Sequence, residues 1–155
     1  MLGSASYTAC VTKVDLSDAI QDYLKEIYKL GTESERVSTS SLARRQQVSP
    51  ASASAMVKKL AALGLAEHTP YRGVTLTHAG AQVALEVIRH HRLLELYLAE
   101  TLGLDLANVH DEADRLEHVI SEELEERIDR ALGFPTHDPH GDPIPDANLK
   151  WPKDA

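Results

Sequence analysis

The stretch Ser49-Pro50-Ala51-Ser52-Ala53-Ser54-Ala55-Met56-Val57-Lys58-Lys59-Leu60 decides the fold. A serine that can cap a helix is followed by proline, which fits the first helical position. The sequence therefore predicts a helix from Ala51 to about Leu63 that ends at Gly64. A capped short helix is predicted within residues 37–48. Two short helices joined by a tight turn are typical of a helix-turn-helix, although helix pairs of other kinds are also common.

The segments on either side of this helix pair extend the motif to a winged helix. Upstream, Asp15–Asp18 offers an N-cap for a helix with an apolar stripe, and Gly31 is expected to close that helix. Downstream, residues 65–69 and 73–77 are predicted to form two short strands around a turn that carries Arg72. The order helix, helix-turn-helix and β-hairpin is that of a winged helix, whose usual ligand is double-stranded DNA.

The expected DNA contacts are side chains that either carry positive charge or are small enough for a helix to enter the major groove closely. Because the first turn of the second helix has no Arg, Asn or Gln, base readout is expected to rest on methyl contacts, hydroxyl groups and DNA shape. The predicted contacts are Arg44, Ser49, Pro50, Ala51, Ser52, Ser54, Lys58, Lys59 and Arg72.

The second half of the chain is predicted to be helical and then irregular. A long helix from about His78 to Thr101 has so many apolar positions that burial at a subunit contact is expected. A further helix begins after Ser121. In the Pro-rich end, a turn-rich linker is favoured over a metal site at His137–His140. The sequence thus predicts a mainly α protein with a flexible tail (1–14), a winged helix-turn-helix domain with a small β-wing (15–77), an all-helical domain (78–134) and a Pro-rich tail (135–155).

Composition predicts a soluble globular protein of the cytoplasm. The 155 residues are 43% hydrophobic and 26% charged, no apolar run is long enough to span a membrane, and no signal peptide is expected. A single cysteine, Cys10, excludes an internal disulfide. Residues 1–80 contain nine Lys/Arg and seven Asp/Glu, a net charge of +2, whereas residues 81–155 contain seven and seventeen, a net charge of −10. The first half can contact phosphates, and the acidic second half attracts cations.

A cation site is predicted in the acidic half, between His110 and His118. If this stretch is helical, four potential ligands share one face, at i, i+4, i+7 and i+8. They are His110, Asp114, Glu117 and His118. Two imidazoles and two carboxylates suit manganese or ferrous iron first and zinc next, while a solvated, charge-rich helix face is the alternative. His91 and Glu95 also lie at i, i+4, where an exposed His beside a helix ion pair is the simpler explanation.

Four stretches occur together in this chain: residues 22–28 (DYLKEIY), 88–95 (IRHHRLLE), 109–118 (VHDEADRLEH) and 139–145 (PHGDPIP). Their combination resembles the diphtheria-toxin-repressor family, the metal-activated winged-helix regulators of iron and manganese uptake. The resemblance runs from about Asp22 to Pro145. It implies that residues 78–134 form a dimerisation and metal-binding domain, and that a homodimer binds an operator in double-stranded DNA.

The resemblance also implies two metal sites. The first would comprise Asp22, Asp114, Glu117 and His118, and the second His91, Glu95 and His110. Carboxylates at positions 22 and 114, where iron-responsive members have Met and Cys, are similar to the manganese-responsive branch. Hard oxygen ligands favour Mn2+ in the same direction, with Fe2+ as the alternative. Manganese regulators of the two-domain type have Glu where this chain has Lys25, which favours the separated second site of iron-type members.

The implied function is a metal-activated transcriptional regulator, a repressor of metal-uptake genes, without a membrane or an organic cofactor. Two other functions stay open: a winged-helix regulator without metal control, and a metal-dependent enzyme whose His/Asp/Glu cluster activates water. A regulator without metal control would bind DNA equally with and without a chelator. An enzyme would turn over a substrate and ignore duplex DNA.

Overall fold

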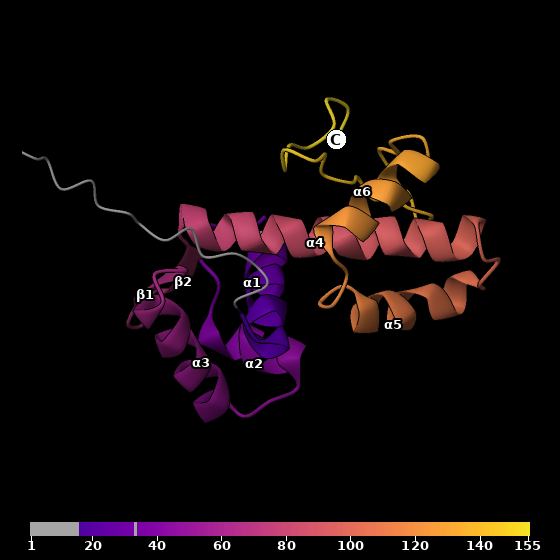
Figure 1. Cartoon of the computed structure of the whole chain (residues 1–155). Coiled ribbons are helices and arrows are strands. Elements are labelled where there is room, and N and C mark those ends of the chain that lie inside the picture. Colours follow the sequence, from indigo (N-terminus) through magenta and orange to yellow (C-terminus); the bar gives the residue numbers. More distant parts are fainter. Residues whose placement is uncertain (1–15, 33) are drawn as a thin grey trace, which may run out of the picture.

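Helices dominate the computed structural model, which describes residues 16–32 and 34–155. The predicted flexible tail 1–14, with Cys10, lies outside the described residues. One two-stranded antiparallel sheet accompanies the helices (Figure 1). In chain order the elements are α1 (Asp18–Gly31), α2 (Thr39–Gln46), α3 (Pro50–Ala62), β1 (Ala66–Thr69), β2 (Gly73–Leu76), α4 (His78–Glu100), α5 (Leu106–Leu116) and α6 (Glu122–Ala131).

Most of these helices have a serine or threonine at the N-cap position. In each case the side-chain oxygen of the N-cap accepts a hydrogen bond from the backbone N–H three residues on, which satisfies one of the free donors of the first turn. These caps are Ser17, Ser38, Ser49, Thr77 and Ser121. The expected closure of the first helix at Gly31 is wrong by one residue, because Gly31 is still helical and Thr32 is the C-cap.

The first half forms the expected winged helix around its own core. Residues of α1, α2, α3, the wing and the start of α4 bury one continuous apolar cluster. In the wing, Ala66 pairs with Leu76 and Thr69 pairs with Gly73. Val37 forms an isolated bridge with Val74, so the segment before α2 is attached to the wing.

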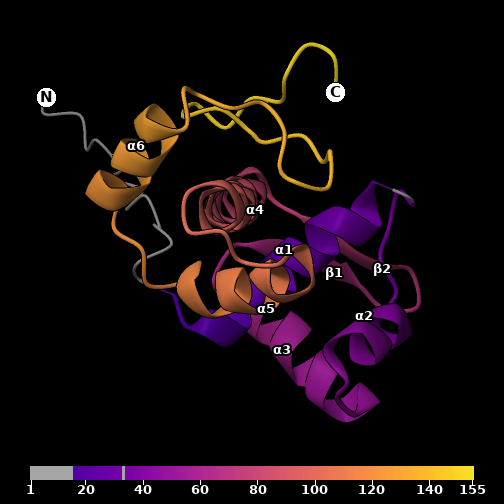
Figure 2. The same cartoon turned by 90° about the vertical axis from the view of Figure 1, so that its right-hand side faces the viewer.

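Helix α4 connects the two halves and is covered on several sides. The winged helix lies beneath its first half, α5 runs along its second half, and α6 and the C-terminal segment lie above it (Figures 1 and 2). The apolar side chains of α4 are therefore buried within the chain itself. The expectation that a subunit contact is needed to bury them is therefore wrong. A second core contains Leu93, Leu94, Leu96, Ala113, Ile120, Ile128 and Ile144.

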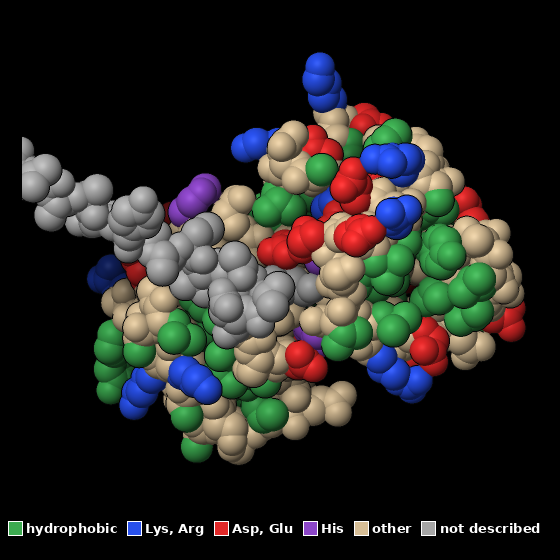
Figure 3. All heavy atoms as spheres, in the orientation of Figure 1, with side chains coloured by type: hydrophobic (Ala, Val, Ile, Leu, Met, Phe, Trp, Pro, Cys, Tyr) green, Lys and Arg blue, Asp and Glu red, His purple; other side chains and the backbone are tan. Residues whose placement is uncertain are grey.

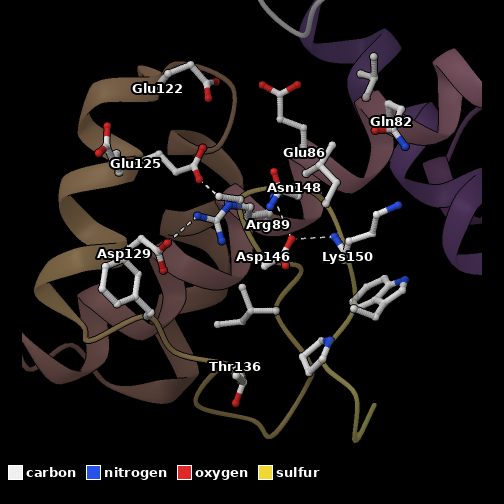
Figure 4. A pocket seen from close by; sticks show the side chains of 18 of the residues that line it. Gln82, Glu86, Arg89, Glu122, Glu125, Asp129, Thr136, Asp146, Asn148 and Lys150 are labelled. Atoms are coloured by element: carbon white, nitrogen blue, oxygen red, sulfur yellow. Dashed lines mark hydrogen bonds and ion pairs between the residues drawn. The ribbon is translucent and has the colours of Figure 1, made fainter.

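The segment after α6 has no helix or strand, as predicted, yet it is packed against the helices. Ile144 is 2% exposed. The buried Arg89 guanidinium donates to the Pro145 carbonyl oxygen at 2.8 Å and to Asp129 at 2.8 Å, and it also pairs with Glu125. Figure 4 shows Arg89 between these two α6 carboxylates. Arg89 also lines a cavity of about 1700 Å³. The fold is mainly α, with a winged helix followed by a helical domain, as expected from the sequence.

Among the described helices, none is both long enough and apolar enough to cross a membrane.

Candidate metal centre and DNA-binding surface

A buried carboxylate, that of Glu117, is at the centre of the candidate metal site. It follows the last residue of α5 and is 0% exposed. Its Oε1 lies 2.7 Å from the Lys25 ammonium of α1, and its Oε2 lies 2.6 Å from Nδ1 of His91 on α4. Three elements that are far apart in sequence therefore meet at one side chain.

The helix predicted through His110–His118 ends earlier than expected. Helix α5 stops at Leu116, Glu117 is its C-cap, and His118 lies in the following turn. The prediction that Glu117 and His118 share a helix face with His110 is therefore wrong. The turn instead directs both side chains toward α1, where His118 Nε2 lies 2.9 Å from Asp22 Oδ1.

Asp22, Glu117 and His118 form the first group that could hold an ion. Their donor atoms all lie within 4.8 Å of one another. Burial alone would lower the pKa of His118, but its hydrogen bond and charge interaction with Asp22 raise it. Without an ion, the contact with Asp22 therefore favours the protonated form of His118.

His91, His110 and Asp114 form a second group within the same distance limit. His91 Nδ1 is 3.2 Å from Asp114 Oδ1, and His91 Nε2 is 3.1 Å from His110 Nδ1. Burial alone would lower the pKa of His91, but hydrogen bonds to Asp114, Glu117 and Glu95 raise it to about 10. Burial alone would raise the pKa of Asp114, but its hydrogen bond with His91 and the charge of Lys25 hold it well below its usual range.

A third group contains two residues that the sequence analysis assigned to a linker. Asp138 and His140 lie beside Glu95 of α4, with His140 Nδ1 3.1 Å from Glu95 Oε2. Across the described residues, this buried Glu95 oxygen makes no hydrogen bond. The Asp-Pro-His spacing was the available signal in the sequence, but no local pattern shows that the tail returns to α4.

The structure therefore redistributes the seven predicted ligands. Of the predicted first site, Asp22, Glu117 and His118 are together, while Asp114 lies with His91 and His110. Of the predicted second site, Glu95 contacts His91 at 2.5 Å but also faces the tail. The donor groups adjoin one another through His91 and Glu117.

Gln21 of α1 orients His118 from behind. Its amide Nε2 donates to the Leu16 carbonyl at 3.0 Å, so its Oε1 faces His118 Nδ1 at 2.7 Å. Nδ1 must therefore carry a proton, which leaves Nε2 as the ring atom that faces Asp22 and Glu117. Such a second partner of a histidine ligand fixes its tautomer and ring orientation.

Lys25 is the unexpected member of the cluster. Its ammonium also lies 3.4 Å from Asp114 Oδ1, and its side chain is 7% exposed. Burial alone would lower the pKa of Lys25, but Glu117, Asp114 and Asp22 raise it, so the side chain stays charged.

The predicted DNA contacts lie on the winged helix. Ser49 caps α3, accepting from Ser52 N–H at 3.1 Å. Gln47, in the left-handed conformation, makes the turn between α2 and α3. The wing turn has Tyr71 at a φ of 63° beside Arg72. All nine predicted contacts are at least partly exposed: Arg44, Ser49, Pro50, Ala51, Ser52, Ser54, Lys58, Lys59 and Arg72.

Two family models match adjoining parts of the chain. "Iron dependent repressor, N-terminal DNA binding domain" matches residues 15–74. "Iron dependent repressor, metal binding and dimerisation domain" matches residues 77–146. The boundary between them falls at the cap of α4, and the second match includes the tail residues Asp138 and His140.

Individual relatives agree with these matches. The diphtheria toxin repressor of Corynebacterium efficiens is 39% identical over 131 residues, covering 84% of this chain and 57% of the relative. An uncharacterized HTH-type transcriptional regulator of Methanocaldococcus jannaschii is 38% identical over 114 residues, covering 73% of this chain and 91% of the relative.

A solved structure of a manganese-dependent transcriptional repressor in complex with manganese has a TM-score of 0.78 and 47% identity, covering 86% of this chain and 62% of that one. The chain thus spans about three fifths of the length of several relatives. With both family models and a relative matched over nearly its whole length, the chain belongs to the iron-dependent repressor family.

Proposed function

We propose that this chain is a metal-activated DNA-binding repressor of metal-uptake genes that works as a cytoplasmic homodimer and not as an enzyme. Manganese is the proposed activator, with ferrous iron as the alternative. The observation that carries the proposal is the position of the first donor group. Asp22 belongs to the DNA-binding half, whereas Glu117 and His118 belong to the helical half.

The donor chemistry fits a divalent ion of this kind. The three groups offer carboxylate oxygens and imidazole nitrogens. Asp114 is a hard oxygen ligand at the position where iron-responsive members have the soft ligand Cys. Glu95 Oε2 is buried and makes no hydrogen bond among the described residues, and its contact with His140 Nδ1 at 3.1 Å suits an oxygen and a nitrogen that would share an ion. The matched solved repressor is described in complex with manganese, which supports the same assignment.

Two sites are proposed from these groups. Asp22, Asp114, Glu117 and His118 would hold one ion. Glu95 would hold the other with His91 and His110, and the tail residues Asp138 and His140 are added to this second set because the structure brings them to Glu95.

The mechanism follows from which elements the ligands belong to. A bound divalent ion supplies the positive charge that lets several carboxylates lie close together. Asp22 already lies 2.9 Å from His118, and a shared ion would bind Asp22 together with Glu117 and His118 more firmly, which would fix α1 relative to α5. Because α1 packs in the same core as α2 and α3, the recognition helix takes up one orientation relative to the helical half. In a dimer, that orientation sets the spacing between two recognition helices.

The dimer contact is proposed on the helical half. Large hydrophobic side chains are exposed around α5 and the start of α6, and Figure 3 shows green side chains gathered on that part of the molecule. An apolar group of this kind on a polar chain marks an interaction surface. Its members are Leu102, Leu106, Leu116, Val119 and Leu124.

The experiment is selection of bound duplexes from a random-sequence DNA library, with Mn2+ and then with chelator. Strong enrichment of a palindromic sequence is expected only with Mn2+. Glu117→Gln keeps the side-chain shape but removes its charge, and it should abolish the enrichment. Glu126→Gln, which changes an exposed α6 carboxylate paired with Arg130, is the matched control and should behave like the parent. Equal enrichment with chelator would contradict metal control, and no enrichment in either condition would contradict DNA binding.

A further inference from the structure

Lys25 places a positive charge inside the proposed ion site. We propose that Lys25 is a built-in competitor of the divalent ion. Its ammonium holds Glu117 in the ion-free protein and has to leave that carboxylate before an ion can bind there. This inference rests on the proposed function, because it assigns a role to a residue of the same site.

Lys25 and the ion would compete for one oxygen atom, Oε1 of Glu117. Glu117 Oε2 is already held by His91, whereas Oε1 lies 2.7 Å from the Lys25 ammonium and 3.4 Å from His118 Nε2. Oε1 is therefore the oxygen on the His118 side of the carboxylate, where an ion shared by the two side chains would bind. With a metal–oxygen bond of about 2 Å, ion and ammonium would be at most about 5 Å apart, where like charges repel strongly in a buried site.

The ammonium has space to move into. A cavity of about 230 Å³ adjoins the cluster and is lined by Asp22, Lys25, Glu26, Gln46 and Asp114. The Asp114 side chain at this edge is 44% exposed, so the space borders solvent. Lysine has a flexible four-carbon stem. The Glu26 carboxylate in the cavity wall pairs with Arg45 through Oε2 at 3.1 Å, and a carboxylate can accept from a second cation as well.

The consequence is a raised threshold for the response. In the ion-free protein, the Lys25–Glu117 pair already joins α1 to the end of α5, and it neutralises a carboxylate that would be costly to bury alone. An ion can bind Glu117 only if the Lys25–Glu117 pair is broken, and the free energy of that pair is then lost. Lys25 therefore weakens ion binding, and the protein responds at a higher ion concentration than its ligands alone would give.

The first test is a calorimetric Mn2+ titration in a His140→Ala background, which removes one ligand of the group around Glu95 and so weakens the second site. Lys25→Met keeps the length of the side chain without its charge, and it should bind Mn2+ at least about tenfold more tightly. Lys29→Met removes the same charge one turn further along α1 and should stay within about threefold of the parent. Unchanged or weaker binding by Lys25→Met would overturn the proposal.

The second test uses the unaltered chain and does not depend on a variant folding. Amine labelling of Lys25, read by peptide mass spectrometry, should be slow without Mn2+ and should rise toward that of the exposed Lys58 when Mn2+ is bound. Bound Mn2+ with Lys25 still protected would overturn this inference and leave the proposed function intact. Failure of Mn2+ to bind any of the proteins would overturn both.

Discussion

His118 donates a hydrogen bond from Nδ1 to Oε1 of Gln21 across 2.7 Å, and Gln21 is itself held by the Leu16 carbonyl. Gln21 is 2% exposed, so this arrangement is shielded from water. Gln21 therefore decides which nitrogen of His118 would face a bound ion, although Gln21 itself would not contact that ion.

Replacing Gln21 by Leu should weaken Mn2+ binding by about 10–100-fold, because an unsupported imidazole loses its fixed tautomer and orientation. Gln21→Glu keeps an acceptor for the Nδ1 proton and should retain most of the affinity. A direct Mn2+ titration of both variants measures this, with circular dichroism to verify that both are folded. Equal loss in the two variants would point to packing and not to the hydrogen bond.

Arg72 at the wing tip should contribute charge and no sequence preference. Arg72→Ala is expected to weaken binding to all duplexes alike and to reduce the slope of log K against log salt by about 1, the effect of one lost phosphate contact. Fluorescence anisotropy at several salt concentrations measures the slope. Arg130→Ala on α6, far from the wing, serves as the control. A changed sequence preference would instead assign base contacts to Arg72.

The buried carboxylate of Glu125 should make stability depend on pH. Burial alone would raise its pKa, but the hydrogen bond with His90 and the charge of Arg89 lower it below the ordinary value of 4.5. As the pH falls below about 4.5, the unfolded chain therefore takes up its proton first, and the stability contributed by Glu125 is lost. Urea unfolding between about pH 6 and pH 3.5 should show a steeper loss for the parent chain than for Glu125→Gln.

The control for that measurement is Glu123→Gln. Glu123 is an exposed α6 carboxylate with an i, i+4 partner, Arg127. Its variant should keep the steep loss of the parent chain. Parallel curves for the parent and Glu125→Gln would show that the acid sensitivity comes from other groups.

Two glycines that look alike in sequence should respond in opposite ways to alanine. A Cβ on Gly80 would lie 1.9 Å from the Leu65 carbonyl oxygen, so Gly80→Ala should destabilise the protein by about 2–3 kcal/mol or more. Nothing lies within 4 Å of a Cβ on Gly31, which is helical, so Gly31→Ala should stabilise it by about 0.5–1 kcal/mol. Chemical denaturation of the two variants measures both, and a stable Gly80→Ala would mean that the Leu65 backbone moves away from α4 easily.

The helices of this fold could be predicted because their signals are local. Ser49 followed by Pro50, the hydroxyl caps and the apolar periodicity all act within a few residues, and the structure has these helices close to the expected bounds. The end of α5 could not be predicted, since no glycine or proline follows Leu116 to mark it.

The sequence predicts the ligands of the candidate site but not how they are grouped. The ligands on α1, α4 and α5 could be proposed from spacing and resemblance, but their grouping depends on how three elements cross. The contact between Lys25 and Glu117 joins residues 92 positions apart. The approach of His140 to Glu95 depends on the path of a segment without regular structure. Local patterns contain no information on either.

The irregular segment after α6 has a consequence for shortened forms of this chain. A fragment that ends at Ala131 would keep every described helix and both strands, and its circular dichroism spectrum would hardly change. It would nevertheless lose Ile144 from the second core, the carbonyl that caps Arg89, and the imidazole beside Glu95. An unchanged circular dichroism spectrum would then fail to reveal that the fragment binds ions more weakly and unfolds at a lower temperature.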